Sequence, residues 1–354
     1  MGKNIVICFD GTGNDFSGPS SNVLKTYRLI IKDAEQGQVA FYDPGVGTVS
    51  TNNAYTAVLN KLIRWRKAIM GGAFGLGVKH NIGDAYHYLM NCYVQGDKVF
   101  IFGFSRGAYT ARAFAGMLKK CGLLHKRCEN LLPYAEKIYF DKNNKEEAEN
   151  FRSSVSRVCT HHLVGVWDTV SSIGRGLSKR TFFDADLNPD VKVGLHAISI
   201  DETRKKFPIS LWAKSKNPKQ ILKQVWFAGV HSDVGGGYPE TGLSDFALSW
   251  MLNEARDNGL KIHSEWGYEV MPYHNAAMHE SREGFWKIWS KKPRIIQPYA
   301  NVEPSADNPV LIHESVYLRM NKKSGIDIYK PTLPIDQYVE IIKEHEDPIN
   351  DLDF

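Results

Sequence analysis

Short runs of consecutive apolar residues alternate along the chain with longer stretches of helical periodicity. The apolar runs end in polar residues or glycine, as buried strands do, and cover residues 4–9, 38–42, 98–104, 162–167 and 224–230. Apolar positions at helical spacing occupy residues 81–94, 108–119 and 245–258. This alternation predicts an α/β fold with a mostly parallel central sheet flanked by helices. In such a sheet the active residues gather at the carboxyl ends of the strands, so catalytic side chains are expected just after each run.

The length and composition of the chain predict one domain with elaborations. The chain has 354 residues, of which 43% are hydrophobic and 23% charged, so it can bury a sizeable core. We expect a single domain over residues 1–354, with helical or loop insertions near 50–80, 172–223 and 260–310 that form a lid. The net charge of +5 is too small to indicate nucleic acid or a strongly acidic partner.

The cysteines and the N-terminus indicate a compartment. The five cysteines are scattered and have no CxxC spacing, which is typical of a reduced, intracellular protein. The first apolar run is too short for a secretory signal, whose apolar region spans about 7–15 residues. The longest uncharged apolar stretch, 68–78, is far shorter than the roughly 20 residues of a membrane span. We therefore expect a cytoplasmic protein in the producing cell, and any export would not use a Sec signal.

A G-x-S-x-G sequence is the strongest chemical signal in the chain. It reads Gly103-Phe104-Ser105-Arg106-Gly107 and lies between a predicted strand and a predicted helix. In the α/β-hydrolase fold, a sharp turn at this place exposes the serine hydroxyl. We therefore predict that Ser105 is a nucleophile and that the Arg106 amide, at the helix N-terminus, stabilises an oxyanion. A chance glycine-serine turn is the alternative.

Two later strand ends supply the base and the acid that a serine nucleophile needs. Asp168 follows the run 162–167 and His231 follows the run 224–230, in the chain order Ser, acid, His of this fold. We predict that His231 takes the proton of Ser105 and that Asp168 orients the imidazole. The alternatives left open are two other acids and a second base without a clear strand before it, namely Asp201, Asp233 and His313.

The turn after the first strand predicts the rest of the oxyanion hole. It reads Asp10-Gly11-Thr12-Gly13-Asn14, and its small residues allow close backbone approach, so we assign Gly11 and Thr12 to the oxyanion hole. A phosphate-binding loop is the competing interpretation, but the Lys-Ser/Thr of a Walker sequence is missing. A second glycine-rich run, 71–77, has no strand before it and suits a mobile lid or a tight packing corner.

Metal and cofactor signals are weak. His161 and His162 are adjacent and would point in different directions on a strand, and Cys159 does not complete a ligand set. Asp10, Asp168 and Asp233 could gather at the strand ends around a divalent ion. We expect no metal and no cofactor.

Two basic segments could meet a surface. Residues 204–223 hold seven Lys or Arg and no acid, interleaved with aromatic and aliphatic residues, and residues 285–299 have a similar mixture. Basic side chains beside aromatics suit the headgroup region of an anionic bilayer, so peripheral membrane contact through 204–223 is one interpretation. Solvated loops over buried aromatics are the alternative. No RNA-binding motif accompanies these segments, and we expect no nucleic acid partner.

Five segments of the chain, in this order, resemble the α/β-hydrolase family of type VI secretion phospholipase effectors. They are residues 6–14, 42–48, 103–112, 167–170 and 229–238, and the resemblance extends over most of residues 4–320. It implies a triad of Ser105, Asp168 and His231 and the hydrolysis of phospholipids or related esters. The sequence identifies no immunity or delivery partner.

The sequence thus predicts a serine hydrolase that cleaves carboxylic esters, foremost phospholipids, through an acyl-enzyme on Ser105. Two alternatives remain open. One is a soluble esterase of small esters, and the other is a non-catalytic binding module with a hydrolase fold.

Overall fold

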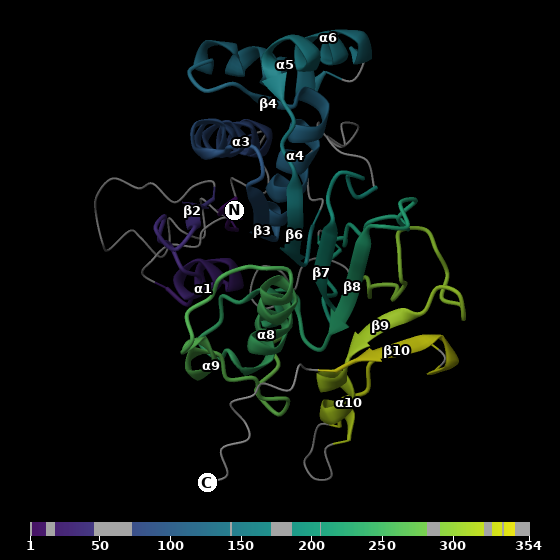
Figure 1. Cartoon of the computed structure of the whole chain (residues 1–354). Coiled ribbons are helices and arrows are strands. Elements are labelled where there is room, and N and C mark those ends of the chain that lie inside the picture. The colour runs from purple at the N-terminus through teal and green to yellow at the C-terminus, as the bar shows by residue number, and fades with distance from the viewer. Residues whose placement is uncertain are drawn as a thin grey trace.

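An eight-stranded sheet forms the centre of the molecule (Figure 1). The structure, a computed structural model, describes residues 2–11, 18–45, 73–141, 144–170, 186–205, 207–281, 291–321, 328–334 and 336–343. The strand order is β10-β9-β8-β7-β6-β3-β1-β2, and every neighbouring pair is parallel. The strands are β1 (Asn4–Phe9), β2 (Gln38–Asp43), β3 (Lys98–Phe104), β6 (His161–Trp167), β7 (Val193–Ser199), β8 (Ile221–Phe227), β9 (Val310–His313) and β10 (Val339–Ile342). The predicted α/β fold with a mostly parallel central sheet is confirmed.

Helices cover both faces of the sheet. One face packs against α3 (Ala73–Cys92) and α4 (Arg106–Cys121), and α5 (Leu132–Phe140) and α6 (Lys145–Val155) pack in turn on α4. The other packs against α1 (Asn22–Leu29), α8 (Gly242–Asp257) and α9 (Trp266–Glu269). Alternate residues of β1 serve the two layers, since Ile5 and Ile7 belong to the first core and Val6 and Cys8 to the second. A smaller core joins α10 (Glu314–Met320) to β8 and β9. The remaining elements are the two-stranded β4 (Leu123–Leu124) and β5 (Ser156–Arg157), the short α7 (His231–Gly235), and two 3-10 turns, Glu129–Leu131 and Asp336–Tyr338.

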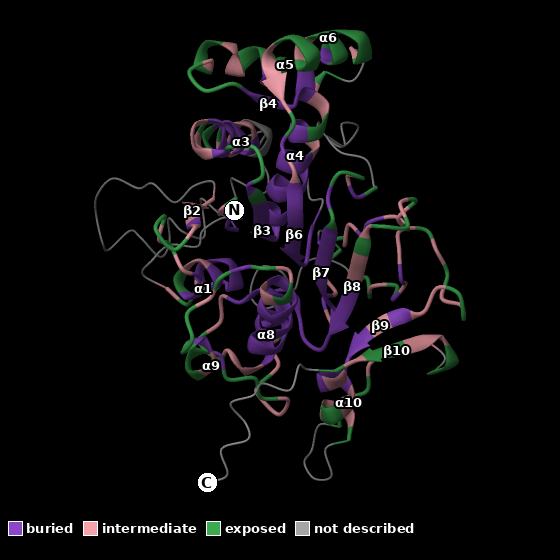
Figure 2. Cartoon of the chain, viewed as in Figure 1, coloured by how far each residue is buried: buried purple, intermediate pink, exposed green. Residues whose placement is uncertain are grey.

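Burial on both faces explains why the central strands are readable in the sequence. Every residue of β1, β6 and β7 is buried, and Figure 2 shows β6 and β7 in the buried centre of the molecule. A strand covered on two sides has no solvent face, so its sequence is a continuous apolar run.

Several boundaries differ from those that the sequence predicted. The helix predicted at 81–94 begins at Ala73, so the described part of the glycine-rich run 71–77 is helical. The strand predicted at 224–230 is β8 and ends at Phe227. The prediction that no strand precedes His313 is wrong, because β9 ends at that residue. Of the predicted insertions, residues 50–72, 172–185, 206 and 282–290 lie outside the described residues.

The cysteines and the helix lengths can be compared with the sequence. All five cysteines are free thiols, and three of them are buried. Among the described residues, no helix is both long enough and apolar enough to cross a membrane.

Candidate active site

Ser105 occupies a sharp turn between β3 and α4. Its backbone has φ 58° and ψ −116°, a conformation that costs free energy in a residue with a Cβ atom. The Ser105 amide donates a hydrogen bond to the Trp167 carbonyl at the end of β6, 3.0 Å away. A Cβ atom on Gly107 would lie 2.1 Å from the Phe9 carbonyl oxygen, so only glycine lets α4 start this close to β1. The turn is the one that the G-x-S-x-G sequence predicted.

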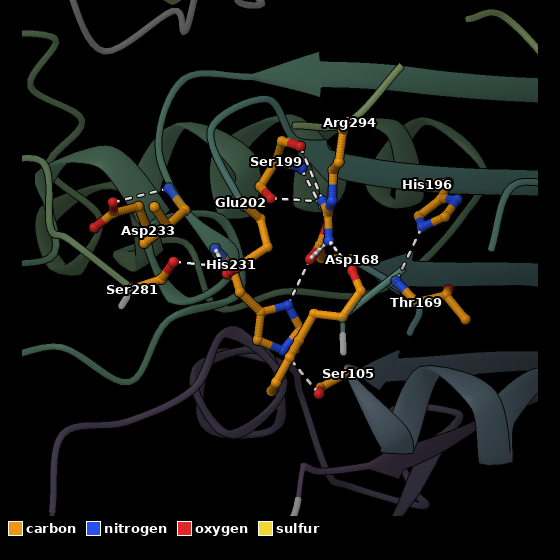
Figure 3. A network of polar contacts seen from close by, with 12 residues as sticks. Ser105, Asp168, Thr169, His196, Ser199, Glu202, His231, Asp233, Ser281 and Arg294 are labelled. Carbon is orange, nitrogen blue, oxygen red and sulfur yellow. Dashed lines mark hydrogen bonds and ion pairs between the residues drawn. The ribbon is translucent and has the colours of Figure 1, made fainter. Parts of the chain in front are cut away.

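His231 joins the serine to a carboxylate (Figure 3). Its Nε2 lies 2.8 Å from Ser105 Oγ, and its Nδ1 lies 2.5 Å from Asp168 Oδ2. The imidazole is buried between the rings of Phe104 and Phe207, with centroids 4.7 and 5.2 Å away. The structure therefore brings together the three residues that the strand ends predicted, in the order that general-base activation of a hydroxyl requires.

Asp168 follows β6 and is hydrogen-bonded to the neighbouring strand, β7. Its amide donates to the Ala197 carbonyl of β7 at 2.8 Å, and the Ser199 amide donates to its Oδ1 at 3.0 Å. The residue is fully buried and has a positive φ of 43°. Asp168 and Ser105 are thus two of the four described non-glycine residues with positive φ. Backbone strain of this kind concentrates at functional sites.

Arg294 contacts the same carboxylate, and the sequence analysis did not find it. Its Nη1 donates to Asp168 Oδ1 at 2.5 Å and its Nη2 donates to Asp168 Oδ2 at 2.9 Å. Nη1 also donates to the carbonyl and the hydroxyl of Ser199, 2.9 and 2.6 Å away. In the sequence, Arg294 was only one cation of the basic segment 285–299. No pattern indicated its role, because Arg294 does not follow a predicted strand as Ser105, Asp168 and His231 do.

The charges of the site favour an ionised acid and a neutral base. Burial alone would raise the pKa of Asp168, but the Arg294 guanidinium and the His231 hydrogen bond outweigh it and hold that pKa well below its ordinary value. Burial lowers the pKa of His231, and the nearby Asp168 carboxylate opposes this only in part. At neutral pH the imidazole is therefore unprotonated at one nitrogen and can accept the serine proton.

A second group of polar residues supports the histidine. Glu202 accepts hydrogen bonds from the Arg204 guanidinium at 2.7 Å, from the Ser281 hydroxyl at 3.0 Å and from the His231 amide at 3.4 Å. On the other side of Asp168, the Thr169 amide donates to His196 Nε2 at 3.1 Å. These contacts fix the backbone on both sides of the candidate base and acid (Figure 3).

The alternative acids have other partners in the structure. Asp233 lies 2.7 Å from His279 Nδ1 and accepts from the Val230 amide at 3.0 Å. Asp201 accepts from the Gly229 amide and the Tyr329 hydroxyl, both at 2.7 Å. Each of these carboxylates therefore ties loops together, and the carboxylate bonded to His231 is that of Asp168.

The alternative base lies at the start of α10. His313 stacks on Phe227 with ring centroids 4.7 Å apart, and its Nδ1 lies 2.9 Å from the Ser315 hydroxyl. It also accepts from the Ser315 amide and so caps the helix. The nitrogen that faces Ser105 Oγ belongs to His231.

The predicted oxyanion hole is described only in part. The Arg106 amide lies in the first turn of α4, where backbone N–H groups have no acceptor within the helix. The Gly11 amide donates to Asp10 Oδ1 at 2.6 Å, a contact that competes with the role we predicted for it. Thr12 lies outside the described residues.

The metal interpretation finds no support in the described part of the chain. No group of three or more His, Cys, Asp or Glu is placed there to hold an ion. Asp10 accepts from the hydroxyls of Ser21 and Tyr42, at 2.6 and 2.7 Å, and Asp168 is occupied by Arg294 and His231. His162 Nε2 lies 2.8 Å from the Asn258 carbonyl.

The aromatic residues of the basic segment 204–223 belong to the interior. Phe207 and Trp212 are buried, the first against His231 and the second under the Arg112 guanidinium, 4.7 Å from the ring. Lys214 and Lys216 stand on the rim of a cavity of about 680 Å³ beside α4 and α6. The aromatic part of the predicted membrane contact is therefore not at the surface, and 282–290 lie outside the described residues.

Comparisons with known proteins identify the family of the chain. The model of the family "T6SS, Phospholipase effector Tle1-like, catalytic domain" matches residues 3–254, which include Ser105, Asp168 and His231. The chain is 34% identical over 219 residues to the uncharacterized protein YEL023C of Saccharomyces cerevisiae, covering 58% of this chain and 32% of the yeast protein. It thus spans about a third of the length of this curated relative.

Two solved structures are similar to parts of the chain at 19% sequence identity. An uncharacterized protein from Pseudomonas aeruginosa has a TM-score of 0.45 and covers 77% of this chain and 49% of its own. A Tle1 effector bound to the VgrG spike of a type 6 secretion system has a TM-score of 0.33, with 68% and 52% covered.

Proposed function

Because the chain belongs to the Tle1-like phospholipase effector family, we propose that it is a serine hydrolase that cleaves the carboxylic esters of phospholipids. The family supports a phospholipase-type hydrolase. The observation that carries the serine mechanism is the continuous line of contacts from Ser105 Oγ through the imidazole of His231 to the Asp168 carboxylate.

The first half-reaction transfers an acyl group to the enzyme. His231 Nε2 takes the hydroxyl proton of Ser105 while Oγ attacks the ester carbonyl, and the carbonyl electrons move onto oxygen. The α4 N-terminus, with the Arg106 amide first, stabilises this oxyanion. As the carbonyl reforms, the bond to the glycerol oxygen breaks, and the imidazolium protonates that oxygen. A lysophospholipid leaves and an acyl-Ser105 ester remains.

The second half-reaction restores the serine. Water enters where the lysophospholipid stood, and His231 Nε2 removes one of its protons as the oxygen attacks the acyl carbonyl. The tetrahedral intermediate expels Ser105 Oγ, which regains its proton from the imidazolium, and a fatty acid is released. Asp168 stays ionised throughout and stabilises each imidazolium that forms.

Fatty acid release from mixed phospholipid vesicles tests the proposal. We expect wild-type protein to release fatty acid and to react with a fluorophosphonate, and Ser105→Ala to do neither. Ser154→Ala, which changes an exposed serine on α6, is the matched control. Retained vesicle hydrolysis in Ser105→Ala would overturn the serine mechanism. Hydrolysis of a short soluble ester alone would indicate an esterase, and absence of labelling would indicate a binding module.

A further inference from the structure

Arg106 carries a buried charge directly beside the candidate nucleophile. It is the first residue of α4, one peptide bond from Ser105, and only 8% of it is exposed. Its Nη1 is fully buried and has no hydrogen-bond partner among the described residues. Burial lowers the pKa of this guanidinium to about 9, so it still carries its charge at neutral pH.

The other buried cations of the site show what Arg106 lacks. Arg294 is paired with Asp168 at 2.5 Å, and Arg204 is paired with Glu202 at 2.7 Å. Both guanidinium groups thereby recover in a carboxylate the solvation that they lose on burial. In the part of the chain that the structure describes, no carboxylate accepts from Arg106. A buried cation without an anion is costly to fold, and titratable groups perturbed in this way concentrate at functional sites.

We propose that Arg106 binds the phosphate of the phospholipid whose ester lies at Ser105. This inference rests on the proposed function and names the group that selects the substrate. In a glycerophospholipid the phosphate is only a few bonds from the ester carbonyl, so it lies within side-chain reach of the residue next to the nucleophile. A guanidinium suits this group, because its planar fork matches two phosphate oxygens. The N-terminus of α4 adds partial positive charge at the same place.

One residue would then fix two parts of the substrate. The Arg106 amide addresses the ester carbonyl and the Arg106 side chain addresses the phosphate, so their separation sets which ester is presented to Ser105. A neutral diacylglycerol with the same acyl chains offers the same ester but leaves the guanidinium without its anion. The wild-type enzyme should therefore prefer the phospholipid.

A pair of matched substrates tests the inference. Dihexanoylphosphatidylcholine and dihexanoylglycerol have the same two esters and differ only in the phosphocholine group. The measured quantity is the ratio of kcat/KM on the phospholipid to kcat/KM on the diacylglycerol. We expect Arg106→Gln to lower this ratio about 10- to 100-fold, the range for loss of one charged hydrogen-bonding partner, mainly through a higher KM for the phospholipid. Arg106→Lys keeps the positive charge but loses the planar fork of the guanidinium. Its ratio should lie between those of the wild type and of Arg106→Gln.

The control removes the same charge from the same helix. Lys119→Gln changes an exposed lysine near the end of α4 and should keep the wild-type ratio. If Arg106→Gln does not fold, Arg106→Lys carries the test, since it leaves the buried charge in place. A wild-type ratio near one, or an equal loss on both substrates in the Arg106 variants, would overturn the role of Arg106. Activity on neither substrate in the wild type would instead contradict the proposed function.

Discussion

Arg294 donates hydrogen bonds to both carboxylate oxygens of Asp168, and His231 contacts one of the same two oxygens. The guanidinium donates to Oδ1 and Oδ2 at 2.5 and 2.9 Å, while His231 Nδ1 lies 2.5 Å from Oδ2. The carboxylate cannot rotate without breaking one of these bonds, so Arg294 fixes the direction in which the acid faces the imidazole. It also offsets part of the negative charge that would otherwise stabilise a protonated His231.

Removing the Arg294 charge should shift the pH profile of the enzyme. The ordinary pKa of histidine is about 6.5, and in the wild type the pKa of His231 is lowered. The acid limb of the kcat/KM profile should therefore lie below that pH. Arg294→Gln leaves Asp168 with more unshared negative charge, which favours the imidazolium and moves the acid limb to higher pH. We also expect kcat to fall about 10- to 100-fold, because the acid is no longer fixed.

Arg294→Lys separates the two effects. It keeps the positive charge and loses the fork, so kcat should fall while the acid limb stays near its wild-type position. A pH–rate profile of the three proteins gives the answer. An unmoved acid limb in Arg294→Gln would mean that the guanidinium only supports the fold.

Ser105→Gly should be more stable than Ser105→Ala. Both variants lack the hydroxyl and should be inactive, but only alanine keeps a Cβ atom at φ 58°. Glycine accepts this conformation without strain, so we expect its free energy of unfolding to exceed that of the alanine variant by about 0.5–1 kcal/mol. Urea denaturation at neutral pH measures the difference. A glycine variant less stable than the alanine variant would contradict strain at the turn.

Gly107→Ala should damage both stability and activity. The new Cβ would meet backbone oxygens of Phe9 and Asp10 at 2.1 and 2.6 Å, so the end of β1 and the start of α4 must separate. We expect a loss of about 1–3 kcal/mol, the usual cost of overpacking, together with lower kcat. Gly116→Ala on the same helix is the control, because its Cβ would meet no backbone atom and would approach the Tyr139 side chain no closer than 3.0 Å. Equal stability of the two variants would count against this close approach.

Buried His161 should make the protein less stable as the pH falls. Burial lowers its pKa to about 4, below the unfolded value of about 6.5, so the unfolded chain binds the proton more tightly. The neutral His161 therefore makes its full contribution to the free energy of unfolding above pH 6.5. As the pH falls toward 4, the free energy of unfolding decreases by about 1.4 kcal/mol per pH unit. His161→Gln should remove this slope. Urea unfolding of both proteins at pH 6.5 and 5.5 isolates the residue, and parallel changes in the two would refute the prediction.

The sequence predicted the residues whose position follows from a strand end. Ser105, Asp168 and His231 follow β3, β6 and β8, and a parallel sheet brings the ends of such strands to one edge. β7 was missed because its run contains Gly194 and His196, which dilute the apolar pattern, although every residue of it is buried. As a result, the Ser199 amide that holds Asp168 was missed as well.

Contacts made by long side chains from distant segments could not be predicted. Arg294 reaches Asp168 from a segment without regular structure, and the same composition would suit a solvated loop. For residues 204–223 the basic neighbours of the aromatic residues left two interpretations open, a membrane contact and a solvated loop over buried aromatics. Phe207 instead packs on His231, a contact fixed by tertiary structure alone.

Arg294 follows Ser105, Asp168 and His231 in the sequence, and this order bears on how the site assembles during synthesis. Synthesis runs from the N-terminus, so Ser105, Asp168 and His231 leave the ribosome before the guanidinium that holds the acid exists. Until then no guanidinium offsets the desolvation cost of burying the Asp168 carboxylate. We therefore expect the ends of β6 and β7 to remain hydrated at that stage. We therefore expect the carboxylate of Asp168 to take its final position only after the segment around Arg294 has been synthesised and has packed against the ends of β6 and β7.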